Sequence, residues 1–309
     1  MKRADREKTI RRIASFLSRE DFAVERRNKE GKIEKIVTPF DKAIIGFELY
    51  DLTKSPIYLE ENVPYLVEKV QQREGSMRWS HSAPRSSPKL PPFPPDADTT
   101  AFALLVLQQA AKAGVSIPQE YLNSGNNDQF EELLHPEGIR TWFGDFGLDE
   151  QPDVAVTSAV ALYFAHAALE HRIYNHLRTT LNRRVQQFDD LPKQTQYYPC
   201  GKYYALLRIA EIARDDHEFL GVAAQKALHV QVEKASLENA LEAAFVGRAA
   251  ALCGIQRKAD EAKDFLMEQR QGNGLWPFVP FYNQKTSWYY GHEAITTIFA
   301  VSALREIEK

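Results

Sequence analysis

The sequence predicts an all-α protein, a closed α/α toroid (an α6/α6 barrel) built from six helical hairpins. Three observations lead to this prediction. A motif of glycine, three residues and tryptophan occurs three times, apolar segments recur every 45 to 58 residues, and a more polar amphipathic segment precedes each apolar one. Such an interval suits one helical hairpin per repeat. Stretches that alternate apolar and polar residues are scarce, so few strands are expected.

The Gly-x3-Trp motif occupies residues 75–79, 138–142 and 272–276. A loop rich in proline or phenylalanine follows each copy, and a pair of hydroxyl residues then opens an apolar run. These pairs are Thr99-Thr100, Thr157-Ser158 and Thr296-Thr297. The tryptophan lies 20, 15 and 20 residues before the first hydroxyl residue of its pair. The recurrence indicates one supersecondary unit repeated along the chain.

The apolar segments centre near residues 43, 99, 157, 204, 249 and 296. The amphipathic ones span roughly 6–19, 62–73, 129–134, 172–187, 218–234 and 257–269. A helix that is apolar nearly all round requires burial on every side, whereas an amphipathic helix keeps one face in water. Two concentric rings, with the apolar helices inside, satisfy both requirements in a single domain over residues 1–309. The alternative is an open array of helical hairpins, whose repeats are shorter, near 34 residues.

Composition excludes some classes of function. The 39 Lys and Arg nearly balance the 42 Asp and Glu, for a net charge of −3, so nothing favours nucleic acid as a partner. Two cysteines, Cys200 and Cys253, are too few for a disulfide framework, and a cytoplasmic protein is expected. No signal peptide or membrane-spanning stretch is expected, and peripheral contact with a membrane stays open.

Asp96 and Asp98 begin the second apolar segment, directly after a proline-rich loop. Two carboxyl groups in a poorly hydrated site do not both ionise readily, so one keeps its proton and can act as a general acid. Thr99 and Thr100 follow at once and are candidates for orienting the pair. Capping of the helix alone explains the same residues, because Asp96 stands where an N-cap is expected. Both interpretations stay open.

Two motifs resemble those of the squalene–hopene and oxidosqualene cyclases. Residues 265–276 resemble the QW repeat, and residues 96–100 are similar to the Asp-x-Asp-Asp-Thr acid motif, in its Asp-x-Asp-Thr-Thr variant. Thr99 replaces the third carboxylate of the usual motif, so no role for that carboxylate carries over. The resemblance implies a class II terpene cyclase with Asp98 as proton donor and Asp96 as its hydrogen-bond partner. The length, with room for one barrel, points to monodomain meroterpenoid cyclases of the merosterolic acid synthase type.

This resemblance implies the substrate and the chemistry. A linear polyprenyl chain, carried on an aromatic acid or a diphosphate, would be protonated at an alkene or epoxide and form fused rings through carbocations. No metal site and no cofactor are expected, and Mg²⁺ enters only with a diphosphate substrate.

Aromatic side chains stabilise carbocations through cation–π attraction, and the loops hold many of them. The candidates for a cavity wall are Trp142, Phe143, Tyr198, Phe278, Phe281, Tyr282, Trp288, Tyr289 and Tyr290. Ordinary core packing is the alternative for any single ring. His81 and His292 are candidates for assisting the acid or accepting the terminating proton, and structural hydrogen bonding is the alternative for both.

Three other functions remain under consideration. A zinc-dependent prenyltransferase-like enzyme would share the fold, but Cys200 and His292 supply only two of the three or four ligands that zinc needs. Tyr198 stands where that family's aspartate is expected. A non-catalytic toroid that binds a lipid or a protein is the second alternative. The third is an unrelated barrel enzyme such as a glycosidase, which would require separated carboxylates across its cavity.

Overall fold

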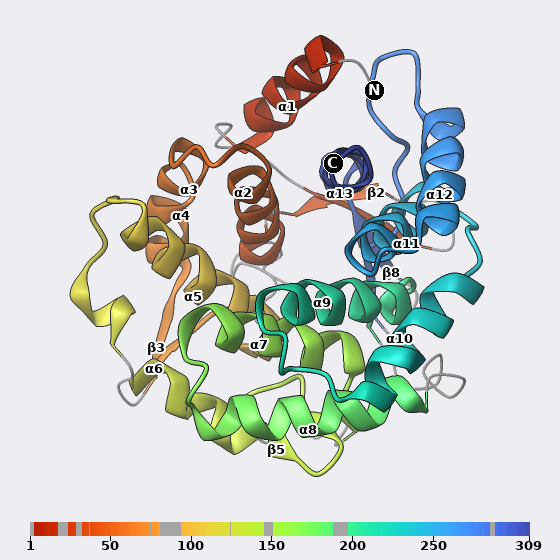
Figure 1. Cartoon of the computed structure of the whole chain (residues 1–309). Coiled ribbons are helices and arrows are strands. Elements are labelled where there is room, and N and C mark those ends of the chain that lie inside the picture. Colours follow the sequence, from red (N-terminus) through yellow and green to blue (C-terminus); the bar gives the residue numbers. More distant parts are fainter. Residues whose placement is uncertain are drawn as a thin grey trace.

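The computed structural model describes residues 3–17, 24–28, 33–36, 38–73, 76–80, 94–123, 125–144, 151–187, 197–284 and 288–309. Within these ranges, six helices form an inner ring (Figure 1). They are α2 (Pro39–Thr53), α5 (Ala97–Lys112), α7 (Val154–Ala167), α9 (Gly201–Asp215), α11 (Ala240–Leu252) and α13 (Glu293–Ile307). Each packs against the next in this order, and α13 packs back against α2, which closes the ring. The predicted α/α toroid is confirmed.

Shorter or more polar helices surround this ring (Figure 1). They are α1 (Arg3–Leu17), α3 (Ile57–Glu60), α4 (Val63–Lys69), η1 (Gln119–Leu122), α6 (Gly125–Asp128), η2 (Gln129–Leu133), α8 (Arg172–Gln186), α10 (Val222–Lys234) and α12 (Gln256–Gln269). The inner helix α7 is buried at every position from 154 to 164, whereas α12 buries four residues on one face. The division of the helices therefore follows their apolar patterns, as predicted.

Short antiparallel strands also join the loops, and the sequence did not predict them. A four-stranded sheet has the order β2 (Ile33–Ile36), β1 (Val24–Asn28), β8 (Trp288–Gly291) and β7 (Tyr282–Gln284). Two hairpins pair β3 (Gln71–Arg73) with β4 (Ser76–Arg78), and β5 (Leu134–His135) with β6 (Gly138–Ile139). The register Arg26↔Tyr290 connects the segment after α1 to the segment before α13. Strands this short carry too little alternation for a periodic signal.

The Gly-x3-Trp motif anchors an outer helix to an inner one. The backbone N–H of Trp79 donates to the Thr100 hydroxyl at 3.0 Å, and its indole N–H donates to the Leu66 carbonyl at 2.8 Å. The final copy repeats these contacts, with Trp276 bound to the Thr297 hydroxyl at 3.0 Å and to the carbonyl of Leu266 at 2.7 Å. Both indoles are fully buried. The motif is therefore a structural element of the repeat.

The middle copy is built differently. Here the backbone N–H of Ile139 donates to the Thr157 hydroxyl at 3.1 Å, so Ile139 stands in the place of the tryptophan. Gly138 before it has a φ of +143°, and an added Cβ would lie 2.5 Å from the same hydroxyl. Trp142 instead donates its indole N–H to the Tyr197 hydroxyl at 3.0 Å. The predicted alignment of Trp142 with Trp79 is therefore wrong by three residues.

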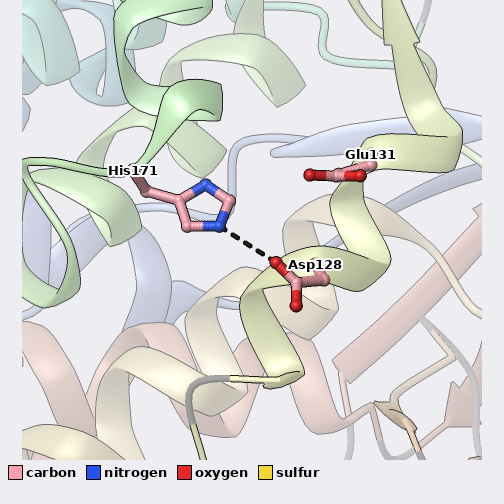
Figure 2. A group of neighbouring side chains, drawn as sticks. All are labelled: Asp128, Glu131 and His171. Atoms are coloured by element: carbon pink, nitrogen blue, oxygen red, sulfur yellow. Dashed lines mark hydrogen bonds and ion pairs between the residues drawn. The ribbon is translucent and has the colours of Figure 1, made fainter.

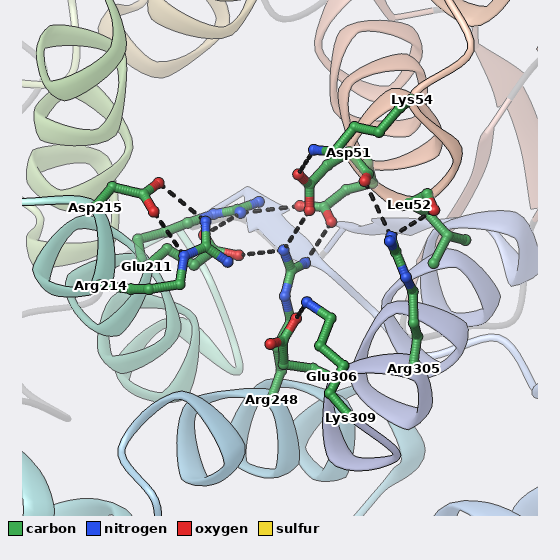
Figure 3. A network of polar contacts seen from close by, with 12 residues as sticks. Asp51, Leu52, Lys54, Glu211, Arg214, Asp215, Arg248, Arg305, Glu306 and Lys309 are labelled. Carbon is green, nitrogen blue, oxygen red and sulfur yellow. Dashed lines mark hydrogen bonds and ion pairs between the residues drawn. The ribbon is translucent and has the colours of Figure 1, made fainter.

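Four charged side chains lie buried between helices of the inner ring. Glu48 of α2 pairs with Arg208 of α9 at 2.9 Å and with Arg248 of α11 at 2.6 Å. Glu211 of α9 pairs with both arginines, at 2.6 Å and 2.8 Å. Arg248 also reaches Asp51, and the network continues outwards from there (Figure 3). All four side chains are at most 4% exposed, so this ionic cluster ties three inner helices together in a low-dielectric interior.

No helix in the described part of the chain is both long enough and apolar enough to span a bilayer.

Candidate active site

The predicted acid pair lies where α5 begins. The backbone N–H of Asp96 donates to the Trp79 carbonyl at 3.0 Å, and that of Ala97 donates to the Thr141 carbonyl at 2.8 Å. Two neighbouring loops thus hold the Asp96 backbone in an extended conformation, with φ −125° and ψ 158°. Such a conformation suits an N-cap residue, and Asp96 Oδ1 accepts a hydrogen bond from the Thr99 backbone N–H at 2.9 Å. The capping interpretation therefore holds for Asp96.

Asp96 also has an unusual protonation equilibrium. Burial raises the pKa of its carboxyl well above the ordinary value, and the charge of Asp98 and a hydrogen bond between the two carboxyls raise it further. The bond from the Thr99 N–H acts in the opposite direction and is the smaller effect. A neutral Asp96 can donate its proton to Asp98, so the pair is a proton reservoir in a nearly dry site.

Asp98 lies in the first turn of α5 and is 5% exposed. The Tyr198 hydroxyl donates to its Oδ2. Burial, followed by the charge of Asp98, raises the pKa of Tyr198 well above its usual value, so this phenol remains a donor at neutral pH. The ring of Tyr198 stacks on that of Tyr204 with centroids 5.6 Å apart, which fixes its position.

Sequence reasoning missed a third carboxylate, Asp153. It caps α7 through Oδ1, which accepts from the Ala155 N–H at 2.7 Å, and its Oδ2 accepts from the Tyr197 N–H at 3.3 Å. The side chain is fully buried. Since Tyr197 and Tyr198 are consecutive, Asp98 and Asp153 lie on neighbouring inner helices and bind adjacent residues of one segment. Pro152 before Asp153 repeats the Pro-Asp step at Asp96 and could have revealed it.

The two threonines of the motif are placed differently. The hydroxyl of Thr100 faces Trp79, whereas the buried hydroxyl of Thr99 has no hydrogen-bond partner in the described structure. Thr99 contacts the pair through its backbone N–H. A role for either hydroxyl in orienting the acid stays a prediction.

The predicted aromatic residues do not form one group. Phe281 and Tyr198 are buried near the acid pair with centroids 5.4 Å apart, whereas Phe143 packs on Phe130 at 5.8 Å. Trp142 is half-buried and contacts Tyr197 edge-on at 5.8 Å. Phe278 is also half-buried. Four further candidates lie in β7 and β8, with side chains outside the described part: Tyr282, Trp288, Tyr289 and Tyr290.

The two histidines have separate outcomes. His81 lies outside the described residues. His292 is the N-cap of α13, and its Nδ1 accepts from the Ala294 N–H at 2.9 Å. This contact fits the structural alternative, and a role as base or acid partner stays a prediction.

One group of potential metal ligands occurs in the described part of the chain, and it lies away from the acid pair. Asp128, Glu131 and His171 come from α6, η2 and the N-cap of α8 (Figure 2). The His171 Nδ1 accepts from the Ile173 N–H at 3.3 Å, so the proton of a neutral ring sits on Nε2, which lies 3.2 Å from Asp128 Oδ1. Glu131 pairs with Arg172. Hydrogen bonds thus account for the arrangement.

The sequence matches no protein-family model and no curated protein. Solved structures do share the fold. One, described as an unsaturated glucuronyl hydrolase specific for heparin, is 11% identical with a TM-score of 0.59, covering 98% of this chain and 97% of that one. Another, described as a novel alpha-amylase from Clostridium perfringens, is 12% identical with a TM-score of 0.58, covering 91% and 89%. At these identities the likeness shows the fold.

These neighbours contradict the predicted terpene cyclase. They are named for acting on carbohydrates, so the predicted family, the cyclisation chemistry and the polyprenyl substrate are wrong. The interior offers a physical reason. Phe281 lies 5.4 Å from Tyr204 and 5.9 Å from Phe40 and Phe299, and only 1% of it is exposed. These rings fill the interior by packing on one another. The QW-like motif misled because its tryptophans serve the repeat itself.

Proposed function

We propose that this protein is a glycoside hydrolase whose proton donor is the Asp96–Asp98 pair. The observation that carries the proposal is a buried carboxyl of raised pKa, hydrogen-bonded to a second carboxyl at the N-terminal end of an inner helix. The shared fold of the two carbohydrate-active neighbours supports it. The reaction needs a carboxylic acid that is still protonated at working pH, and this pair supplies one.

The pair suits two related reactions. In an ordinary glycoside, a neutral carboxyl protonates the leaving oxygen of the glycosidic bond. In an unsaturated sugar, the same acid can protonate a carbon–carbon double bond, after which water adds. We assign the delivered proton to Asp98, which is the more exposed of the two at 5% against 2%, and the reserve proton to Asp96. Asp153 positions the segment of Tyr197 and Tyr198 and does not touch the substrate in this proposal, because it is fully buried.

Trp142 and Tyr197 form the proposed sugar platform. Both are half-buried, and the Trp142 indole N–H bonds to the Tyr197 hydroxyl at 3.0 Å. Trp142 also pairs with Asp96 in an antiparallel backbone bridge, so the platform is tied directly to the acid. Aromatic rings with a polar edge combine an apolar face with hydrogen bonding, as a sugar ring requires.

The test is a sugar-release assay followed by chromatography. Substrates are unsaturated glucuronyl disaccharides with and without sulfate, and α-linked glucose oligomers. We expect the wild type to cleave one class and Asp98→Asn to lose about 10²- to 10⁴-fold in rate, the usual contribution of a general acid. Asp128→Asn, which alters an exposed carboxylate on α6, serves as the matched control and should retain the rate. A wild type inactive on every substrate, or an Asp98→Asn protein of full activity, would contradict the proposal.

We propose further that the reaction needs no cofactor and takes place in the cytoplasm. The pair itself supplies the proton, and Cys200 and Cys253 are both free thiols. Activity in EDTA should equal activity with added Mg²⁺ or Zn²⁺. A loss of rate in EDTA that a metal restores would contradict this part of the proposal.

A further inference from the structure

A polar cavity of about 270 Å³ lies far from the acid pair in sequence. Its walls are the first turns of α1 and the loop 270–274, which follows α12. None of its lining residues belongs to the catalytic group proposed above. The cavity can therefore be analysed independently of the hydrolase proposal.

The cavity is rich in positive charge. Lys8, Arg12 and Arg270 line it, against the single carboxylate of Asp5. Lys8 and Arg12 stand four residues apart on α1 and so share one face of the helix. Two like charges at this spacing destabilise a helix by a few tenths of a kcal/mol, about 0.2–0.5. A bound anion would turn this repulsion into attraction.

Other cations of the same helix are arranged differently. Arg6 pairs with Glu308 at 3.7 Å, and Arg11 pairs with Glu7 at 4.0 Å. Helix α1 therefore places ion-paired arginines at positions away from the cavity and two further cations on the cavity wall. The contrast assigns the surplus positive charge of α1 to this cavity.

Contacts with the wall hold the two arginines in place. Arg12 Nη1 donates to the Asn273 carbonyl at 3.0 Å, and Arg270 Nε donates to the Gly274 carbonyl at 3.3 Å. The Arg270 guanidinium lies 5.6 Å from the ring of Trp276, which is fully buried. Because Arg270 rests on a core residue, part of the entropy cost of ordering its side chain is already met before a ligand binds. This anchoring distinguishes the cavity from a patch of mobile surface lysines.

We propose that this cavity binds an oxyanion of the sulfate or phosphate class. Arginine presents a rigid fork of N–H donors that matches such oxyanions, and lysine adds a point charge. The cavity volume is about nine times the ~30 Å³ that a water occupies in the liquid. It therefore has room for the ion together with a sugar ring that carries it. Two sources share the chemistry, the free ion and a sulfated or phosphorylated sugar.

Isothermal titration of the full chain at constant ionic strength tests the site. The probes are inorganic sulfate, inorganic phosphate, glucose 6-phosphate and glucosamine 6-sulfate, with glucose as the uncharged comparison. We expect saturable binding of the anions and none of glucose. Tighter binding of the sugar-borne anions would identify a sugar ligand, and equal affinity would identify the free ion. Absence of saturable binding to all four anionic probes would overturn the proposal.

Matched variants separate this site from general charge effects. Lys8→Gln with Arg12→Gln changes two exposed residues, so the fold should be kept, and a thermal melt verifies this. Each hydrogen bond to a charged group contributes about 1.5–3 kcal/mol, so the double variant should bind at least about tenfold more weakly. Lys226→Gln with Lys234→Gln removes two exposed cations from α10 and should leave binding unchanged. Equal losses in both double variants would also overturn the proposal.

Discussion

The Tyr198 hydroxyl donates to Oδ2 of Asp98, a carboxylate one hundred residues earlier in the chain. Tyr198 comes from the segment before α9 and Asp98 from the first turn of α5, so the bond crosses the site between inner helices that are not neighbours. The stack of Tyr198 on Tyr204 and the capping network of Asp153 hold this donor from two sides. The environment of the acid is therefore set by a segment outside its own motif.

Tyr198→Phe should lower the turnover rate of the proposed hydrolase while leaving KM nearly unchanged. The ring still stacks on Tyr204, but Asp98 loses a charge-assisted hydrogen bond, worth about 1.5–3 kcal/mol. We expect kcat to fall about tenfold to a hundredfold in steady-state assays. Tyr203→Phe, whose hydroxyl contacts Ser236 at 2.8 Å, is the matched control. Equal effects of the two substitutions would remove Tyr198 from the mechanism.

The raised pKa of Asp96 predicts how stability depends on pH. Because the folded protein holds this proton more tightly than the unfolded chain, the contribution of Asp96 is fully present below the unfolded pKa, near 3.9. It is lost as the pH rises towards the folded pKa. Asparagine at this position keeps the cap but has no proton to lose.

Asp96→Asn should therefore gain stability relative to the wild type as the pH rises from about 4 to neutral. Urea unfolding at several pH values measures this difference. Asp128→Asn on the surface serves as the control. Parallel stability curves for wild type and Asp96→Asn would show that the folded protein does not hold this proton.

The tryptophan anchor predicts a contrast between adjacent threonines. Thr297→Val leaves the buried backbone N–H of Trp276 without its acceptor, which should cost about 1–3 kcal/mol of unfolding free energy. Thr296→Val removes a buried hydroxyl that has no partner in the described structure, so its effect should be near zero or stabilising. Chemical denaturation compares the two. A larger loss from Thr296→Val would refute the assignment of the anchor.

The buried ionic cluster predicts an unusually large loss for a conservative change. Glu48→Gln removes the charge that faces both Arg208 and Arg248, and breaking a buried pair costs about 3–5 kcal/mol. Glu306→Gln breaks the more exposed pair with Lys309 and should cost less than about 1 kcal/mol. Denaturation at pH 7 measures both values. Similar losses would mean that the interior solvates these charges as water does.

The sequence predicted the fold well because the fold follows from periodic burial. The inner helices are apolar all round, and the outer ones have one wet face, so their approximate limits could be read directly. The short strands were missed, and so was the network around Glu48, because charged residues inside apolar helices give no signal of their pairing. Asp96 and Asp98 were found from spacing. Asp153 and Tyr198 meet them only in three dimensions.

The family was misjudged for a related reason. A Gly-x3-Trp turn before a hydroxyl pair solves a packing problem, the attachment of an outer helix to an inner one, as Trp79 and Thr100 show. A feature that serves the repeat can occur wherever the repeat occurs. Function depends instead on which side chains are presented at the helix ends.

Pairing of β1 with β8 and packing of α13 on α2 have a consequence for folding on the ribosome. Helix α2 is made early, yet one of its flanks has no partner until α13 is made, some 240 residues later (Figure 1). Throughout synthesis the growing chain is an open arc with one sticky edge, a state in which a second nascent copy could complete it. Because Arg6 and Glu308 meet in the finished ring, a circular permutant that joins the two ends should fold and would move that vulnerable edge to another pair of helices.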